Sequence, residues 1–152
     1  MYYDVIVLSG GFDPMHVGHL RMIQESANMA QIVVAGVNSD EWLMRKKGYV
    51  FMPCEERLEM VQGVRGVSKA MEFDDNDNSA CDLLRRVRAL WPDFKVAFAN
   101  GGDRTSDNIP EIPVAEELGV HLIWGVGGGK VQSSSDLVNA HPRLASLKNQ
   151  GK

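Results

Sequence analysis

The chain has 152 residues, of which 44% are hydrophobic and 24% are charged, and its formal net charge is −4. This length is enough for one globular domain with a buried core and short for two, so we expect a single domain over residues 1–152. Basic residues are scattered apart from the run Arg45–Lys47, which argues against broad electrostatic binding to nucleic acid or to an anionic membrane surface.

The two cysteines, Cys54 and Cys81, lie far apart without any CxxC spacing. This pattern is typical of reduced thiols rather than of a disulfide scaffold. We expect no secretory leader, and no apolar run in the sequence approaches the roughly 18 residues of a membrane-spanning helix. We therefore expect a soluble, cytoplasmic protein.

Strand and helix patterns alternate along the chain. Short apolar or β-branched runs predict strands, and apolar residues that recur at helical spacing predict helices. The predicted strands cover residues 4–9, 31–37, 69–73, 94–100 and 120–126. The predicted helices begin at Val17 and Ser39 and cover residues 53–64, 80–91 and 112–119, with a final one over residues 133–147 that Pro142 interrupts.

This alternation predicts an α/β fold, a Rossmann-like open and mostly parallel sheet with helices on both faces. Ligands of such sheets bind outside the C-terminal ends of the strands. Three glycine-rich segments follow predicted strands and should meet at that edge, namely residues 10–19, 101–104 and 127–135.

The segment LSGGFDPMHVGHL, residues 8–20, contains a histidine pair, His16 and His19, that could bind either a metal ion or phosphate. A metal site would need a third and usually a fourth ligand, and His121 and His141 have no clustered spacing with Cys, Asp or Glu. Glycines let the backbone approach an anion closely, and a helix N-terminus offers N–H groups and partial positive charge. The segment therefore favours phosphate over metal.

Two other features have structural interpretations. The acidic stretch at residues 73–79 lacks the glycine and terminal Glu of a calcium loop, so we expect a solvated loop. The tryptophans Trp42, Trp91 and Trp124 fall in different elements and are expected to be core or interface residues rather than stacking platforms.

The segment GFDPMHVGHL resembles the signature of the nucleotidyltransferase superfamily with an HxGH motif, the cytidylyltransferase-like group. Further blocks at residues 37–48, 53–64, 98–104 and 131–138 follow in the family's order. Their pattern is most similar to the nucleotidyltransferase domain of ADP-heptose synthase and to glycerol-3-phosphate cytidylyltransferase. The proline of GFDP is more reminiscent of the nicotinamide-nucleotide adenylyltransferase branch.

The resemblance implies a role for each matching residue. His16 and His19 would contact the nucleotide phosphates and stabilise the transition state, Lys46 or Lys47 would reach the α-phosphate, and Arg57 would face the substrate. The implied nucleotide-binding residues are Gly10, Gly11, Phe12, Asp13, Gly18, Gly101, Gly102, Asp103, Ser133, Ser134 and Ser135. Many relatives have Thr or Val at the position of Gly11.

The role of Arg104 is inferred from charge. Val138 stands where many relatives carry a cation beside the leaving pyrophosphate. The planar guanidinium of Arg104 suits bidentate phosphate contact, so we predict that it binds the nucleotide. The alternative is a surface ion pair with Asp107 or Glu111.

The implied reaction transfers a nucleoside monophosphate from ATP or CTP to a phosphorylated sugar or polyol and releases pyrophosphate. Alternatives are a nicotinamide-nucleotide-type adenylyltransferase and a catalytically weak nucleotide-binding module. Mg²⁺ is implied by the triphosphate, which normally holds it with few protein ligands, so no metal-binding residue is predicted. Neither nucleic acid nor a membrane is an expected partner, and dimers are common among the relatives, so a homodimer is compatible with the resemblance.

Overall fold

The structure is a computed structural model that describes residues 2–99 and 109–127. Five parallel strands form one sheet in the order β3-β2-β1-β4-β5. The strands are β1 (Tyr3–Gly10), β2 (Ala30–Val37), β3 (Lys69–Glu72), β4 (Val96–Ala99) and β5 (His121–Ile123). The predicted Rossmann-like open, parallel sheet is thereby confirmed.

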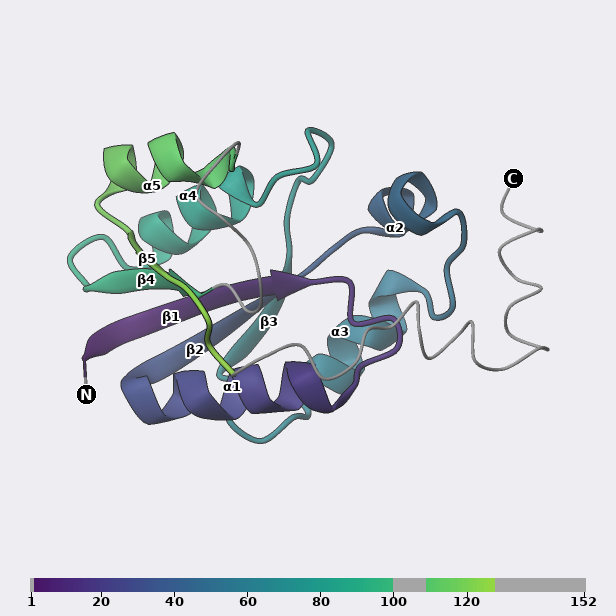
Figure 1. The fold of residues 1–152 in the computed structure, drawn as a ribbon, viewed down its shortest axis with the longest axis horizontal. Coiled ribbons are helices and arrows are strands. Elements are labelled where there is room, and N and C mark those ends of the chain that lie inside the picture. Colours follow the sequence, from purple (N-terminus) through teal and green to yellow (C-terminus); the bar gives the residue numbers. More distant parts are fainter. Residues whose placement is uncertain (1, 100–108, 128–152) are drawn as a thin grey trace.

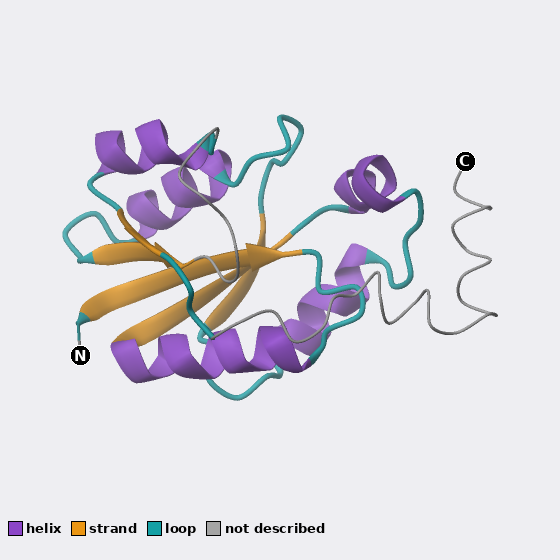
Figure 2. Ribbon diagram, viewed as in Figure 1, coloured by secondary structure: helices purple, strands orange, loops and turns teal. Residues whose placement is uncertain are grey.

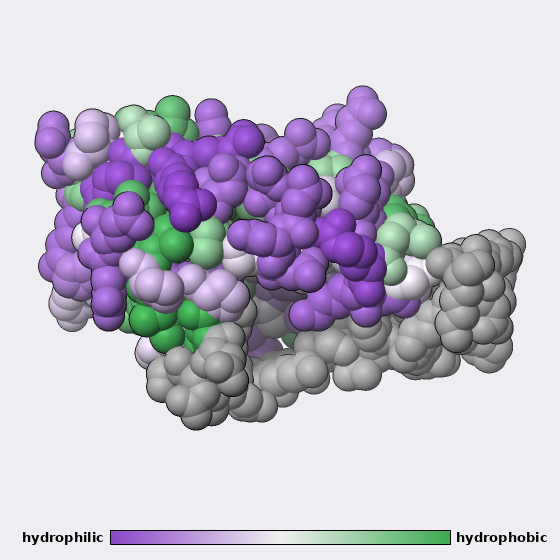
Figure 3. Space-filling view, turned by 90° about the horizontal axis from the view of Figure 1, so that it is seen from above, coloured by the Kyte–Doolittle hydropathy of each residue, from purple (hydrophilic) through white to green (hydrophobic). Residues whose placement is uncertain are grey.

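Helices cover both faces of the sheet (Figure 1, Figure 2). Helices α1 and α3 lie on one face, α4 and α5 lie on the other, and α2 stands beyond the end of the sheet toward which β1 points. Their bounds are α1 (Val17–Met29), α2 (Asp40–Lys47), α3 (Cys54–Gln62), α4 (Cys81–Leu90) and α5 (Glu111–Leu118). Seen from the side of α4 and α5, the surface is largely hydrophilic (Figure 3), as expected of helices that face water with their outer sides.

The core is divided by the sheet into two faces. Val5 and Val7 of β1 pack toward α4 and α5, whereas Leu8 packs with Ile23 of α1 on the opposite face. Successive strand residues point to opposite faces, so a strand buried on both faces needs an unbroken apolar run. The run over residues 5–8 meets this need, and all four of its side chains are fully buried.

Local capping signals set several helix boundaries. Ser39 is the N-cap of α2, where its hydroxyl accepts from the backbone nitrogen of Trp42, and Gly119 ends α5 in a left-handed conformation. Both ends are as the sequence predicts. The predicted strands at residues 94–100 and 120–126 are shorter in the structure, and the helix predicted over residues 133–147 lies outside the described residues. Among the helices that are described, none is long and apolar enough to cross a membrane.

Candidate active site

The turn between β1 and α1 builds the centre of the candidate site. It lies beside the point where the sheet order reverses, since β1 pairs with β2 on one side and β4 on the other. Phe12 adopts a positive φ of 52° in this turn, and its ring is buried against the ring of His19 with 4.8 Å between centroids. The turn thus delivers the predicted histidine pair to the edge of the sheet where ligands of this fold class bind.

His16 and His19 cap the N-terminus of α1 in a reciprocal way. Nδ1 of His16 accepts from the backbone nitrogen of Gly18 at 3.1 Å, and Nδ1 of His19 accepts from the backbone nitrogen of His16 at 3.2 Å. A neutral imidazole that accepts through Nδ1 carries its proton on Nε2. Both rings therefore hold a defined tautomer, and they stack with 3.8 Å between centroids.

The protonation state of His19 follows from its surroundings. Burial, with the nearby His16 and Lys47, lowers the pKa of His19 to about 3. His19 is therefore neutral at physiological pH, and its Nε2 is a hydrogen-bond donor that does not depend on capturing a proton. A neutral donor at a helix N-terminus is suited to bind an anionic oxygen.

The structure separates the two lysines that the sequence left as alternatives. Lys47 is half-buried, and burial lowers its pKa while the carboxylate of Asp13 acts in the opposite direction. Its electrostatic influence also reaches His19. Lys46 instead lies over the ring of Trp42, with Nζ 5.2 Å from the ring centroid. Of the two, Lys47 is the one whose charge contributes to lowering the pKa of His19.

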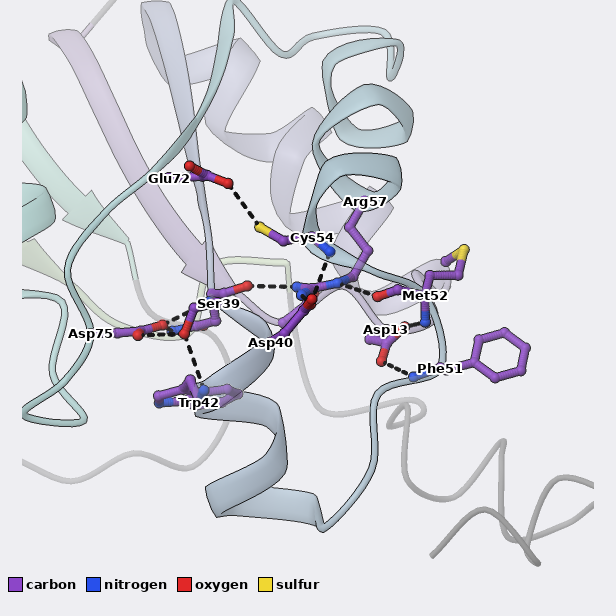
Figure 4. Close-up of polar contacts among 12 residues, drawn as sticks. Asp13, Ser39, Asp40, Trp42, Phe51, Met52, Cys54, Arg57, Glu72 and Asp75 are labelled. Carbon is purple, nitrogen blue, oxygen red and sulfur yellow. Dashed lines mark hydrogen bonds and ion pairs between the residues drawn. The ribbon is translucent and has the colours of Figure 1, made fainter. Parts of the chain in front are cut away.

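Asp13 holds the segment that follows α2. Its two carboxylate oxygens accept from the backbone nitrogens of Phe51 and Met52, each at 2.7 Å (Figure 4). Burial raises the pKa of Asp13, although these two hydrogen bonds and the charges of Arg57 and Lys47 oppose the increase. The sequence-based expectation was a nucleotide contact, whereas this fully buried carboxylate is engaged by the protein's own backbone.

Arg57 occupies a different place from the substrate-facing one that was expected. Its side chain is 0% exposed, and its guanidinium donates to backbone oxygens of Gly11, Asn38 and Met52 at 2.6–2.8 Å. It also pairs with the carboxylate of Asp40 at 2.6 Å (Figure 4). Arg57 of α3 thereby ties together the segments that follow β1, β2 and α2, because each needs a donor for an inward-facing carbonyl.

Asp75 is a residue that the sequence did not single out. Its carboxylate accepts from the side chains of Asn38 and Ser39 and from the backbone nitrogen of Ser39 at 2.7–3.1 Å. The prediction of a solvated loop is confirmed for Asp74 and Asp77, which are exposed. It is wrong for Asp75, which is 2% exposed. An irregular loop has no periodic pattern of apolar residues, so the sequence carries no signal for the burial of Asp75.

A cleft opens along the same edge of the sheet. It has a volume of about 350 Å³. Trp42 and Lys46 of α2 line it, so this tryptophan lies half-buried at a cleft and not in the core. The other lining residues come from the ends of β1, β2 and β3 and from the starts of α4 and α5, and they are Ser9, Gly10, Asn38, Phe73, Asn78, Ser79, Ala80 and Glu111.

Of the remaining predicted residues, one adjoins the histidines and seven lie outside the described residues. Gly18 lies in the first turn of α1, where its nitrogen donates to His16. The predicted nucleotide-binding residues Gly101, Gly102, Asp103, Arg104, Ser133, Ser134 and Ser135 lie outside the described residues and stay predictions. Within the described ranges, no group of three or more His, Cys, Asp or Glu side chains could hold a metal ion.

A parallel sheet of this strand order, with a glycine- and histidine-containing turn at its order reversal, defines a Rossmann-like α/β protein. The chain belongs to the family described as Cytidylyltransferase-like, whose sequence model matches residues 7–124. The predicted family resemblance is thus confirmed.

Named relatives show how far the similarity extends. The bifunctional protein HldE of Geobacter sulfurreducens is 29% identical over 128 residues, which are 82% of this chain and 24% of the relative. The ethanolamine-phosphate cytidylyltransferase of Arabidopsis thaliana is 33% identical over 98 residues, which are 64% of this chain and 22% of that protein. The chain therefore spans about a quarter of the length of the curated relatives that it matches.

Solved structures show the same fold. A lipopolysaccharide core biosynthesis protein from Thermoplasma volcanium superposes with a TM-score of 0.60 at 21% identity, covering 80% of this chain and 93% of the other. A bifunctional NMN adenylyltransferase/ADP ribose pyrophosphatase from Francisella tularensis reaches 0.67 at 21% identity, covering 88% and 40%. Another structure of a Francisella tularensis protein with that name contains AMP and a manganese ion, with a TM-score of 0.57 at 19% identity over 80% of this chain and 36% of that one.

Proposed function

We propose that the chain is a nucleotidyltransferase that moves a nucleoside monophosphate from ATP or CTP to a phosphorylated sugar or polyol. The single observation that carries this proposal is the fixed pair of imidazoles at the start of α1, with Lys47 close enough to influence His19. Both imidazoles are held as Nε2–H tautomers by backbone donors. Such an arrangement suits an anionic, oxygen-rich ligand.

The proposed reaction needs charge stabilisation and alignment rather than proton abstraction. An anionic phosphate oxygen of the acceptor attacks the α-phosphorus, the bond from that phosphorus to the bridging oxygen breaks, and pyrophosphate leaves with the electron pair. Because the nucleophile is already ionised near neutral pH, no general base is required. Positioned donors and cations lower the barrier by stabilising the crowded phosphoryl oxygens.

Each residue of the cluster has a separate task in this proposal. Nε2–H of His19, and the corresponding group of His16, donate to phosphoryl oxygens, and the first-turn N–H groups of α1 add the partial charge of the helix. The Lys47 ammonium neutralises charge at the α-phosphate. Asp13 and Arg57 position the surrounding segments and touch no reacting atom.

A divalent cation such as Mg²⁺ would arrive with the triphosphate in this proposal. The described residues offer no cage of their own, and the Asp13 carboxylate is taken by Phe51 and Met52. This donor set fits an ion held mainly by substrate phosphates, where it would neutralise their charge. A cytoplasmic location and a homodimer stay expectations.

Pyrophosphate release tests the proposal directly. The purified chain with Mg²⁺ is supplied with ATP or CTP and with glycerol 3-phosphate, aldose 1-phosphates, phosphoethanolamine or nicotinamide mononucleotide. Acceptor-dependent release with a sugar or polyol phosphate supports the proposal, and release only with nicotinamide mononucleotide supports the adenylyltransferase alternative. If the triphosphate binds but no acceptor causes release, the chain is a nucleotide-binding module.

A pair of histidine variants assigns the activity to the site. His19→Ala should lower kcat by about 10²–10³ while triphosphate Kd changes little, the usual cost of losing one donor to transition-state charge. His121→Ala is the matched control, because His121 begins β5 at the opposite edge of the sheet. Equal losses in the two variants would overturn the assignment.

A further inference from the structure

The cleft beside Trp42 is a second polar site at the ligand-binding edge, adjoining the histidine turn. Ser9 and Gly10 line it, and Gly10 directly precedes the turn that leads to His16. The Trp42 ring also reaches that turn, since a Cβ on Gly11 would lie 3.6 Å from Trp42 Cζ3. A ligand could therefore place one end in the cleft and another at the histidines.

The polar groups of the cleft are oriented by the protein itself. Asn38 donates through Nδ2 to Asp75, which leaves its oxygen as the acceptor end of the amide. Arg45 donates to Oδ1 of Asn78 at 3.0 Å, which leaves the amide nitrogen as the donor end. An acceptor and a donor of fixed orientation in one cleft suit hydroxyl groups, which can both donate and accept.

Among the residues that the structure describes, the charged groups that line the cleft are one ammonium and one carboxylate. Lys46 comes from α2, and Glu111 comes from the start of α5, where it accepts from the backbone nitrogen of Ala80 at 3.2 Å. Their formal charges cancel. This described part of the lining therefore fits an uncharged, hydroxyl-rich group better than a charged one.

Lys46 changes what the Trp42 ring can bind. An indole face is the strongest side-chain attractor for cationic headgroups, but Lys46 Nζ already lies 5.2 Å from its centroid. Arg45 adds a second cation in a neighbouring hollow of about 200 Å³ that it shares with Trp42, Lys46 and Asn78. A cationic ligand at this ring would thus meet like charge.

We propose that this cleft receives the carbon skeleton of the acceptor, and that Lys46, held over Trp42, makes the subsite select phosphorylated acceptors with an uncharged, polyhydroxylated skeleton over those with a cationic group. The proposal rests on the proposed transfer reaction and adds the determinant of acceptor choice. It sets this chain apart from a relative whose name specifies ethanolamine phosphate, an acceptor with a cationic group.

The acceptor selectivity of matched lysine variants tests whether Lys46 determines the choice of acceptor. Relative kcat/KM is measured for glycerol 3-phosphate and mannose 1-phosphate against phosphoethanolamine and phosphocholine. Lys46→Met should raise the ratio of kcat/KM for acceptors with a cationic group over acceptors without one by about two- to fivefold, the scale of one exposed cation–π contact. Lys95→Met is the control, because Lys95 Nζ lies 5.1 Å from the Tyr3 ring at the opposite end of β1. An unchanged ratio in Lys46→Met, or a wild-type preference for phosphocholine, would overturn the proposal.

A binding measurement separates this inference from the reaction on which it rests. Mannose 1-phosphate is titrated against tryptophan fluorescence of the wild-type chain and of Trp42→Phe, which keeps an aromatic ring but removes the reporter. A signal that depends on Trp42 without any pyrophosphate release would support the subsite and refute the reaction. Turnover with the same KM in wild type, Trp42→Phe and Lys46→Met would support the reaction and refute the subsite. Neither binding nor turnover would refute both.

Discussion

Asp13 and Phe51 are joined by a hydrogen bond of 2.7 Å from the Phe51 backbone nitrogen to the Asp13 carboxylate. The second carboxylate oxygen accepts from the neighbouring residue Met52 at the same distance. The turn before α1 is thereby fastened to the segment after α2, whose last helical residue is Lys47. This contact fixes the position of the histidine turn relative to the segment that follows Lys47.

The first prediction concerns this fastening. Asp13→Asn keeps the size of the side chain but offers only one acceptor to two backbone donors, and its NH₂ group opposes the other N–H. We expect a loss of about 1–3 kcal/mol in the free energy of unfolding, the cost of one buried unpaired donor. A fall in kcat with little change in triphosphate Kd should accompany it if Asp13 positions Lys47. Urea unfolding and steady-state kinetics measure the two effects.

Asp4→Asn is the control for that variant. Asp4 accepts a single backbone hydrogen bond, from Lys95 at 2.7 Å, at the start of β1 away from the site. One amide oxygen can replace that contact, so stability and kcat should stay close to wild type. An equal loss of kcat in both variants would show that Asp13 acts only through general stability.

The second prediction concerns the buried Arg57. Arg57→Met removes the donors of three backbone oxygens and the partner of Asp40, whose own side chain is 42% exposed and keeps contact with water. We expect a loss of roughly 3–5 kcal/mol in the free energy of unfolding, mostly from the unpaired carbonyls. Arg86→Met is the matched change, because the exposed pair of Arg86 with Asp82 should contribute only about 0.3–0.5 kcal/mol. Similar losses would contradict the central position of Arg57.

Local signals predicted most of the fold and the centre of the candidate site. The apolar run in β1, the cap at Ser39 and the glycine that ends α5 each act through nearby residues, so they are visible in the sequence. The place of the histidine pair follows similarly, because the turn joins a strand to a helix. The edge of a parallel sheet then sets where it lies.

Contacts between distant segments could not be predicted in this way. Arg57 is buried because carbonyls from separate loops converge on it, and no spacing within α3 indicates that convergence. Lys46 and Lys47 are neighbours on α2, so residue type alone could not tell which lies over the Trp42 ring and which has a charge that acts on His19. Only their directions around the helix decide, because successive helical residues point about 100° apart.

The third prediction concerns the charge of His19. Its pKa of about 3 in the folded chain lies below the 6.5 of the unfolded chain, so the unfolded state binds more protons between these values. The contribution of His19 to stability is therefore complete above pH 6.5 and is lost as the pH falls toward 3. Relative to His19→Gln, the wild type should lose up to about 1.4 kcal/mol per pH unit within that window.

Nuclear magnetic resonance of the imidazole nitrogens provides the direct measurement. His19 should show the neutral Nε2–H pattern at pH 7 and should keep it at pH 5. The same residue in urea-unfolded chain should titrate near its ordinary value. Protonation of His19 near pH 6.5 in the folded chain would refute both the tautomer and its role as a neutral donor.

The last prediction concerns Gly11, where many relatives of this superfamily have Thr or Val. A Cβ at Gly11 would lie 2.9 Å from Leu43 Cδ2, and Leu43 is fully buried in α2. Gly11→Ala should therefore cost about 1–3 kcal/mol in the free energy of unfolding, because the buried leucine must shift.

Leu43→Val withdraws the crowding methyl group, so the double variant should recover part of the loss, with a coupling of about 0.5–3 kcal/mol. Gly10→Ala is the control, since the atom nearest to its Cβ would be in the Phe12 ring, at 3.4 Å. Thermal and urea unfolding of the four variants measure the cycle, and additive losses at Gly11 and Leu43 would show that Leu43 does not account for the glycine.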